Sequence, residues 1–297
     1  MNYHHCKVFN KVEVDKEVTY MIQRENYVKD KVVVITGASS GFGVLTAERV
    51  AQLGGKPVLA APQRDKLEAI VEKIKAAGGE ASYIVTDVRK KDDVFNMIKF
   101  AVDTYGRVDV LVNNAGTMPL GFFSEHEKAL EKWEECWDVS LKGTLYGICA
   151  VYDQMMAQGC GQVINVSSVY ANFPLQGAGV YQVAKMGVEY LAESLRSECQ
   201  GKIKVTTIKP TGFQRTGLPA TIVDQMAGTS IVSDLITIGD QFENMPARQD
   251  YHDINSITYC DPDPQILADN IVYCIDQPMG ISIGNITVRA SGDLFAL

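Results

Sequence analysis

Tyr181 and Lys185 stand four residues apart in the stretch GVYQVAKMGVEY, which begins at Gly179 and has helical periodicity. Four residues make about one helical turn, so both side chains should lie on the same face of a helix. An ammonium group beside a phenol favours the ionised phenol and lowers its pKa from about 10. The pair therefore predicts a tyrosine that gives or takes a proton near neutral pH. The alternative is a chance pairing on a solvated helix face.

A glycine-rich stretch, TGASSGFG at 36–43, follows the apolar run KVVVIT and precedes a segment of helical periodicity at 44–55. Gly37, Gly41 and Gly43 allow the backbone to turn tightly and to approach a pyrophosphate. The N-terminus of the following helix adds free N–H groups and the positive end of its dipole. This stretch predicts a nucleotide-binding loop, and an ordinary tight turn is the simpler alternative.

The end of the second predicted strand, KPVLAA, bears on the choice between nicotinamide cofactors. A carboxylate there would accept hydrogen bonds from the adenosine ribose 2′-OH and repel a 2′-phosphate. The chain has Ala61 and Pro62 at this place, followed by Arg64 and Lys66. Together with the Ser39 hydroxyl, these residues favour NADP(H), with NAD(H) as the alternative. A solvated loop arginine is an equally good interpretation of Arg64 alone.

Short β-branched runs alternate with helical segments along the whole chain. Strands are expected at KVVVIT, KPVLAA, SYIVT, VDVLVNN, QVINVSS, IKVTTI and GNITVRA, with helices between them. This alternation predicts an α/β fold with a mainly parallel sheet that helices cover on both faces. Two segments stand outside it, a polar N-terminal extension at 1–28 and a long insertion at 213–256. We interpret the insertion as a substrate lid within a single domain at 29–297.

Composition excludes several classes of protein. The 297 residues are 46% hydrophobic, which suits one large domain with a substantial core. A formal net charge of −8 argues against a general nucleic-acid binder. No apolar run reaches the roughly 20 residues of a membrane-spanning helix, and the N-terminus lacks the apolar core of a secretory signal. The 7 scattered cysteines, without a C-x-x-C pair, indicate thiols in a reducing cytoplasm, and the 4 dispersed histidines predict no metal site.

Four stretches in the right order give the chain a resemblance to the short-chain dehydrogenase/reductases, from about Lys31 to Arg289. They are TGASSGFG, NNAG at 113–116, INVSS at 164–168 and YQVAK at 181–185. Ser168 precedes Tyr181 by 13 residues, as the family's catalytic serine precedes its tyrosine. The resemblance implies a three-layer, Rossmann-type, doubly wound α/β fold with a mainly parallel, seven-stranded sheet.

The resemblance also implies roles for individual residues. Tyr181 would be the general acid/base, Ser168 would hydrogen-bond the same substrate oxygen, and Lys185 would lower the pKa of the tyrosine and hold the nicotinamide ribose. The cofactor-binding residues would be Gly37, Ser39, Gly41, Phe42, Gly43, Arg64, Asp87, Val88, Asn114, Ala115, Gly116, Tyr181, Lys185, Pro210 and Gly212. The substrate-binding residues would be Met118, Ser168, Tyr170, Tyr181 and Phe213.

Three positions depart from the family's pattern. Ser140 replaces an asparagine that typically holds a water linking the lysine to solvent, and we count it with the catalytic residues. Thr211 stands where a glycine is usual near the nicotinamide, and Pro62 replaces an arginine that accompanies NADP(H) in many relatives. These departures affect the proton relay and the choice of cofactor.

The leading expectation is an oxidoreductase that interconverts a secondary alcohol and a ketone by hydride transfer. The alternatives are a cofactor-binding protein that has lost turnover, and an epimerase or dehydratase on the same fold. The resemblance further implies a homo-oligomer, a tetramer or a dimer, with an interface of helices near 139–158 and 180–198. Candidate interface residues are Leu145, Ile148, Val188 and Leu191.

Overall fold

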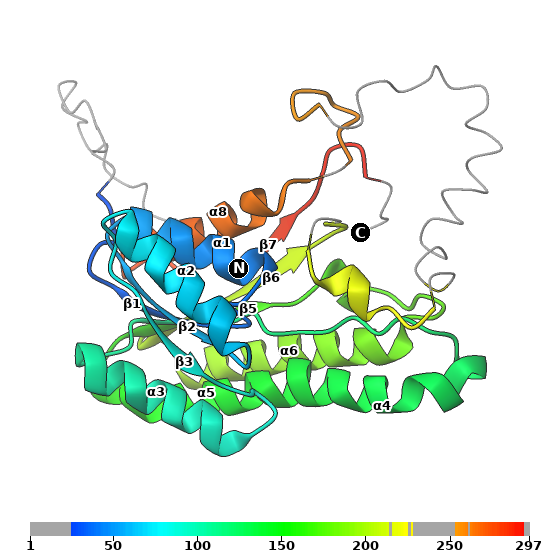
Figure 1. Cartoon of the computed structure of the whole chain (residues 1–297), viewed down its shortest axis with the longest axis horizontal. Helices are drawn as coiled ribbons and strands as arrows, with labels where there is room; N and C mark the ends of the chain where they lie inside the picture. Colours follow the sequence, from blue (N-terminus) through cyan, green and yellow to red (C-terminus); the bar gives the residue numbers. More distant parts are fainter. Residues whose placement is uncertain (1–24, 214–215, 225–226, 228–252, 261, 294–297) are drawn as a thin grey trace, which may run out of the picture.

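The computed structural model describes residues 25–213, 216–224, 227, 253–260 and 262–293, which Figure 1 draws in colour. Their strands form one sheet in the order β3-β2-β1-β4-β5-β6-β7, and every neighbouring pair is parallel. The strands are β1 (Val32–Thr36), β2 (Lys56–Ala61), β3 (Ser82–Val85), β4 (Val110–Asn113), β5 (Gly161–Val166), β6 (Ile203–Pro210) and β7 (Asn285–Val288). The predicted Rossmann-type α/β fold is confirmed, and its sheet is parallel throughout.

Helices cover both faces of the sheet (Figure 1). One face carries α1 (Gly41–Gln52), α2 (Arg64–Ala76) and α8 (Pro264–Ile275), and the other carries α3 (Lys91–Tyr105), α5 (Gly143–Gln158) and α6 (Gly179–Glu198). α4 (His126–Cys136) runs into α5 through η2 (Trp137–Lys142), which is π-helical. Short 3-10 turns form η1 (Phe123–Glu125), η3 (Val169–Ala171) and η4 (Leu218–Thr221).

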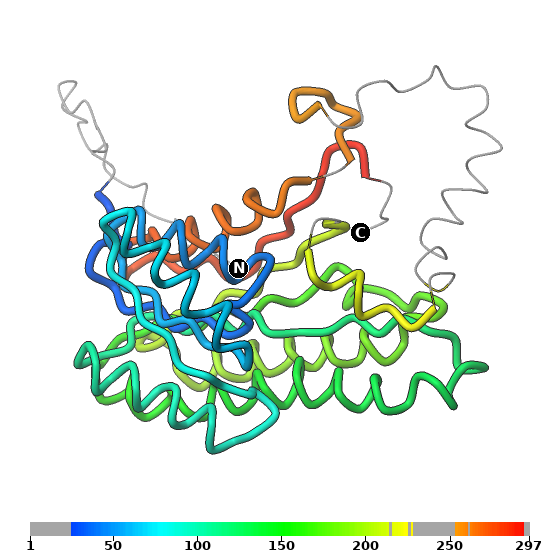
Figure 2. Tube along the Cα trace, viewed as in Figure 1, coloured from blue at the N-terminus to red at the C-terminus, as the bar shows by residue number. Residues whose placement is uncertain are grey.

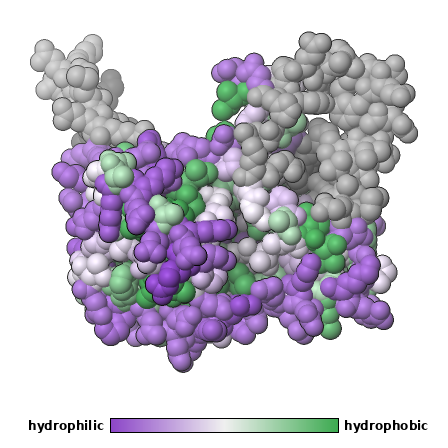
Figure 3. Space-filling view, viewed as in Figure 1, coloured by the Kyte–Doolittle hydropathy of each residue, from purple (hydrophilic) through white to green (hydrophobic). Residues whose placement is uncertain are grey.

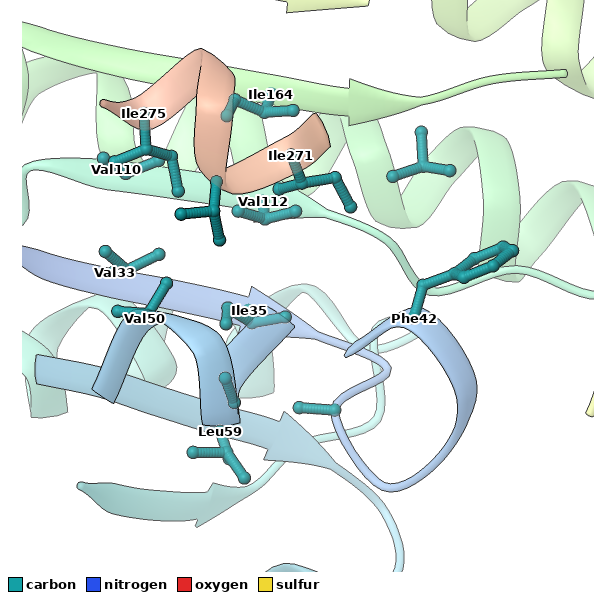
Figure 4. Packing of buried hydrophobic residues seen from close by; sticks show 14 of the residues in the cluster. Val33, Ile35, Phe42, Val50, Leu59, Val110, Val112, Ile164, Ile271 and Ile275 are labelled. Atoms are coloured by element: carbon teal, nitrogen blue, oxygen red, sulfur yellow. The ribbon is translucent and has the colours of Figure 1, made fainter. Parts of the chain in front are cut away.

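The strands are apolar on both sides because the sheet is buried on both sides. Val33 and Ile35 face α1 and α8 and pack with Ile271 (Figure 4), whereas Leu111 and Val163 face the opposite layer of helices. Full burial of a side chain of this size contributes roughly 1.5–3 kcal/mol. The two apolar layers fix the register of the strands, and the register fixes where their carboxyl ends lie.

The chain leaves β1 and β4 in opposite directions, since β2 and β3 lie on one side of this pair and β5, β6 and β7 on the other. At such a switch point the two connecting loops diverge and leave a crevice at the carboxyl ends of the strands. The predicted glycine-rich loop follows β1, and the NNAG stretch follows β4. Both motifs therefore border the crevice.

Some predicted boundaries differ from the structure. The first helix begins at Gly41 and ends at Gln52, rather than spanning 44–55, because the last residues of the glycine-rich loop are already helical. The chain before β1 is partly packed, since Val28 is fully buried and Tyr27 N donates to Asp276 Oδ1 (2.7 Å). Residues 1–24 and most of the predicted lid lie outside the described residues, so the division into extension, domain and lid stays a prediction.

The surface in Figure 3 is mainly hydrophilic, with hydrophobic residues in small groups. Figure 2 follows the chain from the end of β6 into residues 216–224, drawn in yellow, on the side where the strands end. Over the part of the chain described above, no helix has the length and apolar character to cross a bilayer. The same residues contain no group of three or more His, Cys, Asp or Glu side chains placed to hold a metal ion.

Candidate active site

Close backbone contacts shape the glycine-rich loop between β1 and α1. Gly37 has a φ of +65°, and a Cβ there would lie 2.9 Å from Ala115 Cα. A Cβ at Gly43 would lie 2.5 Å from the Gly37 carbonyl oxygen. Neither position accepts a side chain unless the loop moves. The glycines therefore hold the first turn of α1, with its free N–H groups, against the crevice.

The loop after β4 is tied to the glycine-rich loop by Asn114. Its backbone N–H donates to Thr36 Oγ1 (3.0 Å), and its Nδ2 donates to the Thr36 carbonyl (2.9 Å). One residue earlier, Asn113 Nδ2 donates to Asn165 Oδ1 on β5 (2.9 Å). The two asparagines of NNAG thus join β1, β4 and β5 and fix the floor of the crevice.

A cleft of about 370 Å³ runs along these loops. Most of the predicted cofactor-binding residues line it: Gly37, Ser39, Gly41, Phe42, Asp87, Val88, Asn114, Ala115, Gly116, Tyr181, Lys185 and Pro210. Gly43, Arg64 and Gly212 are not among its lining residues. A Cβ at Gly116 would lie 3.4 Å from Lys185 Nζ, so Gly116 lies directly beside this amine. A long cleft with backbone walls and a helix N-terminus fits a dinucleotide.

The end of the cleft near β2 and β3 is polar. Ser39 Oγ donates to Gln63 Oε1 (2.8 Å), directly after β2. The Asp87 carboxylate accepts from the Arg89 guanidinium (2.8 Å from Nη2 to Oδ2), and Arg89 Nη1 donates to Glu135 Oε1 (2.9 Å). The Arg89 hydrogen bonds hold the pKa of Asp87 below its ordinary value. Asp87, one of the predicted cofactor-binding residues, is therefore already engaged by Arg89.

The predicted catalytic tyrosine and lysine are both buried on α6, with exposed fractions of 3% for Tyr181 and 5% for Lys185. Ser168 caps η3 by accepting from Tyr170 N. Burial raises the pKa of Tyr181 above its ordinary value, and the Ser168 hydrogen bond offsets part of this rise. This direction differs from the lowered pKa predicted from the pairing, because burial outweighs the hydrogen bond in this structure.

Lys185 lies beside the ring of Tyr181, with Nζ 5.8 Å from the ring centroid. Its Nζ donates to the Val166 carbonyl at the end of β5 (2.8 Å). Burial lowers the pKa of this amine to about 8. The lysine therefore places a partly desolvated ammonium group at the wall of the cleft, next to Gly116.

Ser140 lies in the π-helical segment η2 and is almost fully buried. Its Oγ is 3.4 Å from Thr117 N, which donates to it, and 3.9 Å from Cys136 Sγ. Its carbonyl accepts from Thr144 Oγ1 (2.7 Å). A Cβ at Gly116 would be 3.4 Å from Ser140 Oγ, the same distance as from Lys185 Nζ. The structure thus brings Ser140 to the lysine's side of the cleft.

The predicted substrate-binding residues fall into two groups. Tyr170 packs edge-to-face on Tyr181, with ring centroids 5.6 Å apart, and Met118 packs against the same cluster of hydrophobic residues. Phe213 packs edge-to-face on Phe42 (5.3 Å) and belongs to the core beneath α1. Tyr170 and Met118 therefore lie beside the tyrosine, and Phe213 lies against the cofactor side.

Part of the predicted lid is described, and we call residues 216–224 the strap. A Cβ at Gly41 would lie 3.7 Å from Thr216 Cβ, so the strap passes over the glycine-rich loop. Met118 N donates to Thr221 Oγ1 (2.8 Å), and Val223 N donates to the Leu120 carbonyl (3.0 Å). The strap is thus fastened to the loop after β4. Residues 225–226 and 228–252 of the predicted lid lie outside the described residues.

Several residues that line the cleft were not among the predicted site residues, although four of them, Thr216, Gly217, Leu218 and Thr221, lie within the predicted lid. They are Ser40, Ala61, Pro62, Gln63, Thr86, Arg89, Thr117, Glu135, Val139, Val166, Ser167, Thr216, Gly217, Leu218 and Thr221. Gln63 could have been predicted, because it is the first polar residue after β2 and cofactor contacts are expected at this place. The strap has neither helical nor alternating periodicity, so its hydroxyl groups carried no comparable signal.

Comparison with known proteins agrees with this geometry. The family model for short chain dehydrogenases matches residues 31–227. The chain belongs to this family. An uncharacterized oxidoreductase of Listeria innocua is 36% identical over 264 residues, which cover 88% of this chain and 96% of the relative. The predicted family is therefore confirmed, and it places the chain among the oxidoreductases.

Two solved structures illustrate the likeness in fold. A metagenomic short-chain oxidoreductase in complex with NADP has a TM-score of 0.67 at 26% identity, covering 89% of this chain and 98% of its own. An alcohol dehydrogenase from the archaeon Thermococcus sibiricus, complexed with 5-hydroxy-NADP, has a TM-score of 0.73 at 21% identity, covering 91% of this chain and 100% of its own. At 21% identity, the likeness to the alcohol dehydrogenase concerns the fold alone.

Proposed function

We propose that this protein interconverts a secondary alcohol and a ketone, with NADP(H) as the hydride carrier and Tyr181 as the general acid/base. One observation carries the proposal. Tyr181 and Lys185 are buried side chains that line a cleft whose walls fit a dinucleotide, and Ser168 is buried as well. A nicotinamide bound there supplies or accepts the hydride, and the protein handles the proton.

Each side chain of the group has a separate task. The raised pKa keeps Tyr181 protonated at neutral pH, so it is ready to give a proton to a carbonyl oxygen. Ser168, whose hydroxyl proton is free to be donated, donates to the same substrate oxygen and holds it in place. Lys185 adds positive charge beside the ring and so favours the phenolate that forms when the proton has left.

Replacing Tyr181 by Phe tests this proposal. The ring still packs against Tyr170, but the proton is gone, so kcat should fall about 100- to 10,000-fold. Turnover is measured from nicotinamide absorbance with a panel of ketones and alcohols, and cofactor affinity should not change. Tyr190→Phe is the matched control, because Tyr190 is an exposed phenol on the same helix, and it should keep full activity. A Tyr181→Phe variant with more than about a tenth of the wild-type kcat would refute the assignment.

The preference for NADP(H) is part of the proposal. The second strand ends in Ala61 rather than in an aspartate or glutamate. Ser39 and Gln63 form a neutral, hydrogen-bonded pair beside it. The NADP complex of the metagenomic relative agrees with this preference. NADP(H) should therefore raise the melting temperature more than NAD(H) at equal concentration. A ligand at 100 times its dissociation constant adds about 2.7 kcal/mol of stability.

Gln63→Asp sharpens this prediction, because a carboxylate at this place repels a 2′-phosphate and accepts from a ribose hydroxyl. The variant should bind NADP(H) roughly tenfold more weakly, which corresponds to about 1.4 kcal/mol, and should bind NAD(H) at least as well as the wild type. Isothermal titration with both cofactors measures this. A larger thermal shift of the wild type with NAD(H) would overturn the preference.

We also propose that the protein acts on small molecules in a reducing compartment, the cytoplasm. Cys136, Cys199 and Cys274 are buried free thiols, which agrees with such a location.

A further inference from the structure

A buried amide, Gln182, connects the helix that carries Tyr181 to the loop that carries Ser168. Gln182 follows Tyr181 directly on α6 and is 5% exposed. Its Nε2 donates to the carbonyl oxygens of Tyr170 (3.0 Å) and Phe173, and its Oε1 accepts from Leu175 N (3.0 Å). One side chain thus satisfies three backbone groups of the loop at 169–175.

These hydrogen bonds continue to the reacting groups. The N–H of Tyr170 donates to Ser168 Oγ (3.3 Å), and the Ser168 hydroxyl lowers the pKa of Tyr181 against the rise that burial causes. Because Ser168 Oγ already accepts from Tyr170, its own proton remains to be donated to the phenol or to a substrate oxygen. The chain of hydrogen bonds thus runs from Gln182 through the Tyr170 peptide to Ser168, whose hydroxyl acts on Tyr181, the neighbour of Gln182.

A second anchor of the same loop is weaker. Lys209 Nζ donates to Asn172 Oδ1 (3.0 Å) and pairs with Glu189 (2.6 Å), but these two charged side chains are 17% and 22% exposed. Only one bond of this anchor reaches the loop, and it contacts a single side chain, that of Asn172. A buried backbone group left without its partner costs about 1–3 kcal/mol, and Gln182 satisfies three of them. Gln182 is therefore the stronger constraint on the loop.

We propose that Gln182 is a positioning residue for catalysis, which holds the Ser168 hydroxyl and the Tyr170 ring against Tyr181 so that both hydroxyl groups meet one substrate oxygen. The inference rests on the proposed function. The polar atoms of Gln182 bond the backbone of the loop, so it acts through Ser168 rather than on the substrate. A purely structural amide would support the loop's stability without affecting the rate of the folded enzyme.

A double-mutant cycle with Ser168 separates these two roles. Gln182→Met keeps the length of the side chain and removes its polar atoms. In the wild-type background, kcat per cofactor-binding site should fall roughly tenfold, with the cofactor dissociation constant unchanged. In the Ser168→Ala background, the same change should cost less than about twofold, because the group through which Gln182 acts is already gone. If Gln182→Met lowered kcat by the same factor in both backgrounds, or did not lower kcat in the wild-type background, the proposal would be overturned.

Gln162→Met is the matched control. Gln162 is a buried amide on β5 whose Nε2 donates to the Cys274 carbonyl (3.0 Å), far along the strand from Ser168. This variant should lower the melting temperature and leave kcat per site unchanged. A fall in kcat as large as that of Gln182→Met would show that the loss is a general effect of removing a buried amide.

If Gln182→Met does not fold, Gln182→Glu replaces it in the cycle. The carboxylate still accepts from Leu175 N, and once protonated it also donates to one carbonyl of the loop. The kcat of this variant relative to the wild type should therefore rise as the pH is lowered, and a ratio that does not vary with pH would contradict the proposal.

The proposed function and the positioning role fail in different ways. The function fails if the wild type with NADP(H) reduces no ketone, or if Tyr181→Phe keeps its rate. The positioning role alone fails if Tyr181→Phe and Ser168→Ala both lose turnover while Gln182→Met shows no coupling to Ser168.

Discussion

Lys185 places a titratable amine where little water reaches it. Burial lowers its pKa from an ordinary 10.5 to about 8, and the Val166 carbonyl is its backbone acceptor. Between these two pH values the unfolded chain binds more protons at this residue than the folded protein does. The free energy of unfolding must then rise with pH over the same window. Below pH 8 the buried charge reduces stability in full, and toward pH 10.5 its effect disappears.

Lys185→Met tests this coupling, because the methionine has no charge to titrate. Between pH 7 and pH 9.5 the wild type should gain about 2 kcal/mol of unfolding free energy relative to the variant. Urea unfolding of both proteins at both pH values measures this difference. Lys204 and the other titratable groups are present in both proteins, so their pH dependence cancels. The variant should also lose turnover. A difference that stays constant with pH would mean that Lys185 titrates normally.

At the scale of elements, the π-helical segment η2 sets the position of Ser140. A π-turn inserts extra backbone into a helix, and such insertions often occur at functional sites. Here it interrupts the path from α4 to α5 beside Cys136, and the Thr144 hydroxyl bonds the Ser140 carbonyl (2.7 Å). This bond stabilises the backbone of the segment at the point where Ser140 Oγ meets Thr117 N.

Thr144→Val removes that hydroxyl and keeps the shape of the side chain. The variant should lose about 1 kcal/mol of stability, the usual worth of one buried hydrogen bond. If η2 positions Ser140 for proton transfer, kcat should also fall severalfold. Thr46→Val is the control, because Thr46 Oγ1 is buried without a hydrogen-bond partner among the described residues. It should be neutral or stabilising in thermal unfolding, and Thr144→Val with the same result would remove Thr144 from this role.

The elements that could be predicted from sequence are those with local signals. A continuous apolar run and a glycine-rich loop identify β1 and α1, and the loop's position after a strand identifies the cofactor side. The π-turn could not be predicted, because one extra residue hardly changes helical periodicity. The burial of Tyr181 depends on contacts with residues far away in the sequence. The sequence therefore predicted a lowered pKa for this tyrosine, whereas burial raises it. Gln182 bonds backbone atoms of a loop, and sequence patterns do not report such partners.

Over the whole molecule, exposed hydrophobic side chains gather along α4, η2 and α6. Leu130, Trp137, Val183, Met186 and Tyr190 are between 42% and 74% exposed. Exposed apolar groups on adjacent helices are typical of an interface between subunits. The prediction that Ile148 and Val188 contribute to an interface is wrong, because both side chains are buried within their own chain. Leu145, by contrast, is 38% exposed.

A homo-oligomer that uses this face should dissociate when a charge is placed on it. Val183→Glu is expected to give a species near the 32.6 kDa of one chain, while the wild type gives two or four times that mass. Light scattering at micromolar concentrations measures both. Phe95→Glu, at an exposed position on α3, should leave the mass unchanged. A wild type that stays at the mass of one chain would rule out the oligomer.

The strap at 216–224 touches the cofactor side and the substrate side of the site at once. Thr216 passes over the glycine-rich loop at Gly41, and Thr221 accepts from Met118 N beside Tyr181. In the proposed reaction, a dinucleotide would lie beneath Thr216 and a substrate against Met118, so both would contact the strap. We therefore expect a compulsory order of binding, in which the dinucleotide enters first and is the last to leave.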